Sequence, residues 1–171
     1  PELVDRLKYR HAVFRRDLLD AWELAIDGFL GLIASATMGT EARQALLEIC
    51  RARESDEQRE IVLEALEEHY VEHGDNEGHL AVLLVRADAA TPGIERAAAL
   101  REAATVCLPD VARAASDPDV AQNAFDLYAQ ALYEDPADDV ALARMTDIAQ
   151  GTGNWSGLVE ACEVCAEKAG L

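Results

Sequence analysis

The chain has 171 residues, half of them apolar, and 33 Asp and Glu against 15 Lys and Arg give a formal net charge of −18. This length and apolar content suit one domain with its own core. So acidic a surface repels phosphate backbones and anionic lipids, which argues against nucleic acid and membranes as partners and favours a basic peptide or protein. The alternative is that the charge only keeps the protein in solution.

The residue types favour helices and a reducing compartment. Much of the apolar content is alanine, the best helix former, whereas aromatics and clusters of β-branched residues, which favour strands, are few. Four cysteines are too few for a disulfide scaffold, so we expect a cytoplasmic protein. No signal peptide is visible, and the most apolar stretch, residues 24–38, is too short to span a bilayer. Because the chain starts at Pro1 rather than Met, we expect it to be a piece of a longer protein.

Apolar residues recur at helical spacing along nearly the whole chain, and Gly, Pro or capping residues separate the periodic segments. We therefore predict an all-α fold of about nine helices joined by short loops. The predicted helices cover residues 1–35 (two helices), 40–52, 55–74, 76–89, 94–115, 118–135, 139–150 and 154 onward.

Residues at the ends of the earlier segments predict where helices start and stop. Thr40 is expected to cap the third helix, and Ser55 is expected to open the fourth with a capping box. Pro109 removes a backbone hydrogen bond, so the helix expected over residues 94–115 should kink or break near Leu108.

The last three helices have similar signals. Pro118 lies where a proline is tolerated, in the first turn of its helix. Asp138 or Asp139 is expected to cap the next helix, residues 151–153 to form a turn, and Asn154 to cap the last helix.

Internal similarity is the strongest feature of the sequence. Residues 66–80 match residues 145–159 at an offset of 79, and Gly74 aligns with Gly153. Both segments are predicted to form a helix, a glycine turn and a second helix. Two repeats of about 40 residues fit in this offset, as in solenoids of helix pairs. Since one pair cannot bury its apolar face alone, neighbouring pairs must stack.

The spacing of Ala124, Tyr128, Ala131 and Pro136 resembles the second helix and closing proline of a tetratricopeptide repeat. This resemblance implies a right-handed α-solenoid of antiparallel helix pairs that binds protein partners along its concave surface. We expect the whole chain, residues 1–171, to form a single domain of this kind. The resemblance is clear over residues 60–171, and residues 1–59 are expected to be a degenerate N-terminal repeat.

Two residue pairs have spacings that suggest chemistry. Cys162 and Cys165 form a C-x-x-C, and His69 and His73 lie four residues apart on one predicted helix. A metal-binding or redox role is therefore an alternative function. The resemblance, however, places both cysteines at buried packing positions, and neither a second C-x-x-C nor an H-E-x-x-H frame is present. Because the sequence also lacks a phosphate loop and a nucleophile elbow, we expect no enzyme activity, no cofactor and no metal.

The candidate binding residues lie on two predicted helices. On the helix that starts near residue 57, three glutamates lie opposite the apolar side, and on the helix that starts at residue 139 the resemblance places four residues toward the concave surface. The seven residues are Glu64, Glu68, Glu72, Val140, Ala143, Asp147 and Gln150. In relatives that clamp a peptide's terminal carboxylate, Lys and Asn occupy the positions held here by Ala143 and Asp147, so that mode of binding is not expected.

These observations predict a non-catalytic scaffold for protein–protein interaction that binds a basic peptide segment in an acidic, partly apolar groove. An alternative is a structural spacer or self-association module of a larger protein. Residues 1–20 carry a net charge of +1 and the remaining residues a net charge of −19, which favours end-to-end contacts, including contacts in a homo-oligomer.

Overall fold

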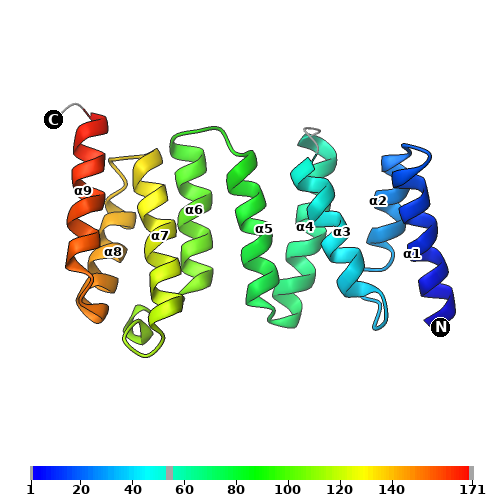
Figure 1. The fold of residues 1–171 in the computed structure, drawn as a ribbon, viewed down its shortest axis with the longest axis horizontal. Helices are drawn as coiled ribbons and strands as arrows, with labels where there is room; N and C mark the ends of the chain where they lie inside the picture. The colour runs from blue at the N-terminus through cyan, green and yellow to red at the C-terminus, as the bar shows by residue number, and fades with distance from the viewer. Residues whose placement is uncertain (1, 53–55, 170–171) are drawn as a thin grey trace. The chain divides into compact units, whose positions relative to one another are not determined.

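The computed structural model describes residues 2–52 and 56–169 (Figure 1). Over these two ranges it contains nine α-helices, one short 3₁₀ helix and no strand, which confirms the predicted all-α class. The elements are α1 (Glu2–Asp17), α2 (Trp22–Leu30), α3 (Gly39–Ala52), α4 (Asp56–His73), α5 (Asn76–Ala89), α6 (Ile94–Cys107), η1 (Val111–Arg113), α7 (Pro118–Glu134), α8 (Asp139–Thr152) and α9 (Trp155–Ala169).

The chain divides into two compact units, Pro1–Val85 and Arg86–Leu171, and the boundary falls inside α5. Each unit has its own cluster of buried apolar side chains. Within each unit, successive α-helices alternate in direction (Figure 1). In the first unit α1 packs on α2, α2 on α3 and α3 on α4, and in the second α6 packs on α7, α7 on α8 and α8 on α9.

The first unit is built on close packing between α1 and α2 and on larger side chains further along. A Cβ added to Gly28 of α2 would lie only 2.9 Å from the Cβ of Ala12 on α1, so glycine permits this approach. The core around it is formed by Phe29, Leu46 and Leu63, whose side chains have no exposed surface. The α4 helix contacts both α3 and α2.

The second unit is built on an alanine seam between α6 and α7. The fully buried alanines of this seam are Ala97, Ala104, Ala121, Ala124 and Ala131. Small side chains let the two helix backbones approach closely, and the ring of Tyr128, only 1 % exposed, fills the remaining space. The α7 helix also packs against α8 and α9.

Most predicted helix ends are confirmed. Residues 1–35 contain two helices, and α6 stops at Cys107, directly before the predicted break at Leu108. The side chain of Asp117 caps α7 by accepting a hydrogen bond from the amide of Val120 at 3.3 Å. Asn154 caps α9 in the same way, through the amide of Gly157 at 3.2 Å.

Two predicted ends are wrong. The α3 helix begins at Gly39, so Thr40 lies inside it and does not cap it. The hydroxyl of Ser35 instead accepts hydrogen bonds from the amides of Thr37 and Met38, both at 3.2 Å, and this starts the turn that leads into the helix. At the other end of the chain α8 continues to Thr152, so the predicted three-residue turn is reduced to Gly153 and Asn154. The capping box at Ser55 lies outside the described residues.

No helix in the described ranges combines the length and the apolar character needed to cross a membrane.

Candidate functional site

The α4 helix has a buried apolar side and an exposed acidic side. Leu63 and Leu66 are fully buried, whereas Glu64, Glu68 and Glu72 are exposed, as the sequence predicts. Within the described part of the chain, none of these three glutamates forms an ion pair with a basic side chain. Their carboxylates therefore face solvent without a counter-charge from the protein.

Two aliphatic side chains lie among these glutamates, and the sequence reasoning did not identify them as surface residues. Ile61 is 54 % exposed and Val71 is 57 % exposed. Residues 61, 64, 68, 71 and 72 fall on one stripe of a helix with 3.6 residues per turn. Helical spacing alone places Ile61 on the same side of the helix as Glu64 and Glu68. The sequence did not show that Ile61 is exposed, because an isoleucine at this spacing also fits the buried side of a helix.

The α8 helix presents the corresponding residues of the second unit. Val140 is 54 % exposed, and Ala143, Asp147 and Gln150 are exposed, while Met145 on the opposite side is fully buried. At the offset of 79 residues Val140 corresponds to Ile61, Ala143 to Glu64 and Asp147 to Glu68. Each unit therefore carries one helix whose exposed stripe starts with a β-branched aliphatic residue and continues with an acidic one.

The turns that follow these two helices have the same local geometry. Gly74 and Gly153 both adopt the left-handed conformation, with φ of +65° and +79°. After each glycine, a side-chain oxygen accepts a hydrogen bond from the amide three residues on: Asp75 from Gly78 at 2.9 Å, and Asn154 from Gly157 at 3.2 Å. Glycine adopts such a φ at the lowest steric cost, which explains the aligned glycines.

The two histidines of α4 are engaged in contacts within the protein. The Nε2 atom of His69 lies 3.1 Å from Nη1 of Arg43, and His73 donates from Nδ1 to the backbone oxygen of His69 at 2.7 Å. Since a guanidinium can only donate, Nε2 of His69 accepts and is occupied. Burial, together with the charge of Arg43, lowers the pKa of His69.

A third histidine, His79, lies close to this pair in sequence and pairs with Glu67 at 3.2 Å. Among the residues that the structure describes, no group of three or more His, Cys, Asp or Glu is arranged to hold a metal ion.

The two cysteines of the C-x-x-C face different surroundings. Cys165 is buried against α7 and its thiol donates to the backbone oxygen of Leu132 at 3.5 Å. Cys162 is exposed, so the expectation that both cysteines are buried is wrong for this residue. The reason is helical spacing, because Ala161 and Cys165, four residues apart, form the side of α9 that packs on α7.

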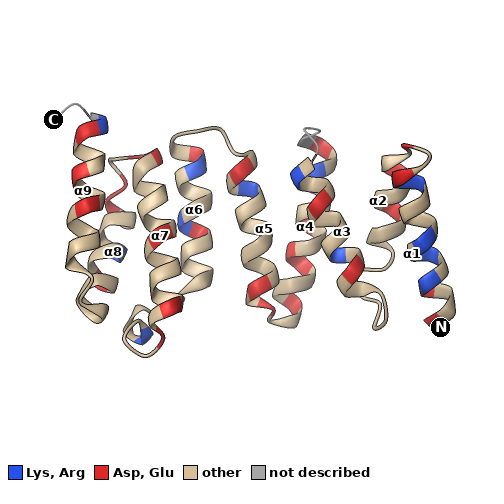
Figure 2. Ribbon diagram, in the orientation of Figure 1, with Lys and Arg blue, Asp and Glu red and all other residues tan. Residues whose placement is uncertain are grey.

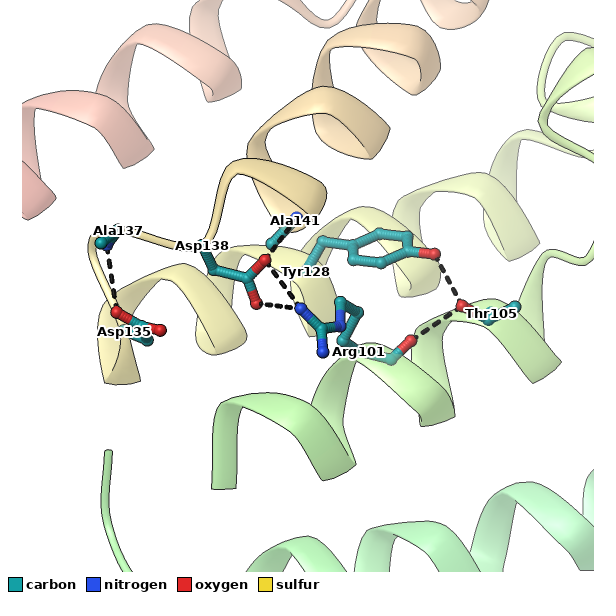
Figure 3. Close-up of polar contacts among 7 residues, drawn as sticks. All are labelled: Arg101, Thr105, Tyr128, Asp135, Ala137, Asp138 and Ala141. Carbon is teal, nitrogen blue, oxygen red and sulfur yellow. Dashed lines mark hydrogen bonds and ion pairs between the residues drawn. The ribbon is translucent and has the colours of Figure 1, made fainter. Parts of the chain in front are cut away.

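A half-buried ion pair joins α6 to the start of α8 (Figure 3). The side chain of Asp138 is only 4 % exposed and both its oxygens lie 2.9 Å from Nη1 of Arg101. One of these oxygens also accepts from the amide of Ala141 at 3.0 Å, which makes Asp138 the N-cap of α8. The sequence predicted a cap at Asp138 or Asp139 but gave no sign of the partner 37 residues earlier.

Next to this pair, Tyr128 closes the polar layer between α6 and α7 (Figure 3). Its hydroxyl lies 3.0 Å from the hydroxyl of Thr105, which donates to the backbone oxygen of Arg101 at 2.9 Å. These hydrogen bonds and the ion pair join α6 to α7 and to the start of α8.

The arrangement separates two kinds of polar residue. Arg101, Asp138, Arg43 and His69 hold helices in place, while the exposed stripes of α4 and α8 offer carboxylates and aliphatic groups to solvent. The exposed groups can form ion pairs, hydrogen bonds and apolar contacts with another molecule. No known protein family, curated protein or solved structure matches the chain.

Proposed function

We propose that the chain is a non-catalytic protein-interaction module in which the exposed stripe of α4 and, separately, that of α8 each bind a basic peptide segment. One observation carries the proposal. At equivalent places of the two helices, an exposed aliphatic residue (Ile61, Val140) stands on the same stripe as an exposed carboxylate (Glu68, Asp147). Exposed aliphatic groups next to carboxylates suit the stem and the charged end of an Arg or Lys side chain.

The physical basis is the pairing of two types of contact. Carboxylates without a counter-charge bind Arg and Lys through charge-assisted hydrogen bonds, and the aliphatic residues contact the stems of these long side chains. The net charge of −18 also attracts a basic segment from a distance, so association should be faster at low salt.

The direct test measures the binding of a fluorescently labelled peptide of alternating Arg and Leu by fluorescence anisotropy over a series of salt concentrations. The matched probe is the same peptide with Glu in place of Arg. We expect binding of the Arg peptide that weakens as salt rises and no binding of the Glu peptide. Equal affinity for both peptides, or binding of neither, contradicts the proposal.

A variant and its matched control then locate the site. The triple variant Glu64→Gln, Glu68→Gln and Glu72→Gln should bind the Arg peptide at least about tenfold more weakly, because three unpaired carboxylates are lost. The control replaces three exposed glutamates of α9, Glu160, Glu163 and Glu167, by Gln and removes the same charge. If both triple variants weaken binding equally, only the net charge matters and the stripe is not the site.

A second candidate function is a structural self-association module. It is favoured by a different observation, the large apolar side chains that α1 exposes.

A further inference from the structure

The α1 helix has one packed side and one exposed apolar side. Ala12 is buried against α2, whereas Leu3, Leu7 and Phe14 are 71 %, 57 % and 47 % exposed. Leu18, which is 70 % exposed, continues the helical turn because its amide donates to the oxygen of Phe14 at 3.0 Å. Spacings of four, seven and four residues place these four side chains on one stripe, called here the α1 stripe. Apolar side chains gathered in this way mark an interaction surface.

Basic residues border the α1 stripe on both sides. The helix carries five basic and three acidic residues, and Figure 2 shows its Lys and Arg spread along its length. Lys8 and Arg10 are exposed on opposite borders of the stripe, whereas Arg6 pairs with Glu2 at 2.8 Å. A partner of this surface therefore needs an apolar centre and an acidic border.

The α9 helix offers such a surface. Its side toward α7 is formed by Ala161 and Cys165, and its exposed side carries Trp155 and Val159, which are 51 % and 56 % exposed. Cys162, one turn further along the helix, is exposed on the same side. Together Trp155, Val159 and Cys162 are called here the α9 stripe.

Acidic residues border the α9 stripe. Glu160, Glu163 and Glu167 are all exposed, and Figure 2 shows acidic segments along α9. The only basic residue in the described part of α9, Lys168, turns to the other side and donates to the backbone oxygen of Tyr133 at 3.2 Å. The border of the α9 stripe is thus opposite in charge to the borders of the α1 stripe.

We propose that the α1 stripe of one copy docks on the α9 stripe of a second copy. The apolar centres are removed from water, and Lys8 and Arg10 face the carboxylates of Glu163 and Glu167. Charge decides in favour of this occupant, because a second copy is strongly acidic and attracts α1, whereas an anionic lipid surface repels a protein with a net charge of −18. Since the two surfaces differ, each copy has one of each, and association is head-to-tail. This contact uses helices other than α4 and α8, so it stands or falls independently of peptide binding.

Charge reversal with exchange of partners tests the contact by sedimentation equilibrium of the whole chain at low salt. One variant carries Lys8→Glu and Arg10→Glu, and the other carries Glu163→Lys and Glu167→Lys. We expect the average mass of the unaltered chain to rise with concentration. Each variant alone should associate at least about tenfold more weakly, because like charges then face each other. An equimolar mixture of the two variants should regain association, because each α1 again meets an α9 of opposite charge.

Two further variants separate this contact from general charge effects. Arg113→Glu with Arg144→Glu changes the net charge as much as the α1 variant does, on exposed residues outside α1 and α9, and should leave association unchanged. The Glu64, Glu68 and Glu72 triple Gln variant should also associate like the unaltered chain. Helix content measured by circular dichroism confirms that each variant is folded.

Several results would overturn the proposal. The first is that the unaltered chain stays monomeric at every concentration. The second is that the variant with Glu163→Lys and Glu167→Lys associates as the unaltered chain does. The third is that the mixture of the two variants fails to regain association. The second of these results would mean that α1 docks on another acidic surface, such as α4. A last experiment is sedimentation with anionic lipid vesicles. If the chain is monomeric and binds the vesicles, and replacing Leu7 and Phe14 abolishes this binding, then the α1 stripe binds lipid and not a second copy.

Discussion

Replacing the buried Asp138 by Ala should destabilise the second unit, because this side chain has two structural roles. It caps α8 through the amide of Ala141 and pairs with Arg101. Loss of an N-cap costs about 1 kcal/mol. Removing one partner of a buried pair costs about 3–5 kcal/mol, but the Arg101 side chain is 35 % exposed and regains water, so about 1–2 kcal/mol remains. The expected sum is about 2–3 kcal/mol.

Asp138→Asn separates the two roles. Asparagine is as good an N-cap as aspartate, so this variant should keep the cap and lose only the charge pairing, about 1–2 kcal/mol. Arg101→Met leaves the carboxylate of Asp138 in place, only 4 % exposed, with the amide of Ala141 as its remaining partner. We expect this variant to lose about 2–4 kcal/mol. The double variant Asp138→Ala with Arg101→Met should cost less than the sum of its parts.

The assay is urea unfolding followed by tryptophan fluorescence in a Trp22→Phe background. The chain has two tryptophans, and this change leaves Trp155 of the second unit as the reporter. The change in midpoint multiplied by the slope gives the loss in free energy of unfolding. The reasoning is refuted if Asp138→Ala costs less than about 0.5 kcal/mol, the range of ordinary surface substitutions. It is also refuted if Asp138→Asn costs as much as Asp138→Ala.

Three further predictions concern glycine, thiol and histidine positions. Gly78→Ala should cost about 1–3 kcal/mol in urea unfolding, because a methyl there overlaps the buried ring of Tyr70. Gly157→Ala at the equivalent turn meets the half-buried side chain of Asn154, the cap of α9, which can shift more easily than a buried ring, so this change should cost less. The exposed thiol of Cys162 should react with a thiol reagent long before that of Cys50, whose pKa burial raises to about 11, and equal rates would contradict the described burial. Burial lowers the pKa of His69 below its ordinary value of 6.5, so as the pH falls the unfolded chain takes up a proton on this residue before the folded chain does. The free energy of unfolding should therefore fall as the pH drops below 6.5. The variant His69→Gln should show a smaller fall when unfolding curves are measured over a range of pH.

Local signals predicted the fold class and most helix ends, because caps and helix breakers act within one turn of the backbone. Asp117 before Pro118, Pro109 after Leu108 and the left-handed Gly153 all act this way. The same reasoning failed at Thr40, where a good capping residue lies inside a helix. An alternative acceptor five residues earlier, Ser35, already satisfies the preceding amides, and the sequence gives no means of ranking the two.

Contacts between residues far apart in the chain could not be predicted from the sequence. The pairing of Arg101 with Asp138 and the contact of Arg43 with His69 depend on how helices pack, and no local pattern marks either pair. The exposure of Glu64, Glu68 and Glu72 followed from helical spacing and is confirmed. The role of these residues in binding stays a prediction.

The alanine seam between α6 and α7 has a consequence for how this hairpin folds. Alanine has no side-chain rotamers to lose, so joining the two helices along the seam carries almost no side-chain entropy cost. Leu and Met in the same places would bury more surface but would lose rotamer freedom, and they would allow several alternative packings of similar energy. Alanine methyl groups have no alternative rotamers, so they allow fewer alternative packings of the two helices. The hairpin therefore has a better defined structure, although it buries less apolar surface.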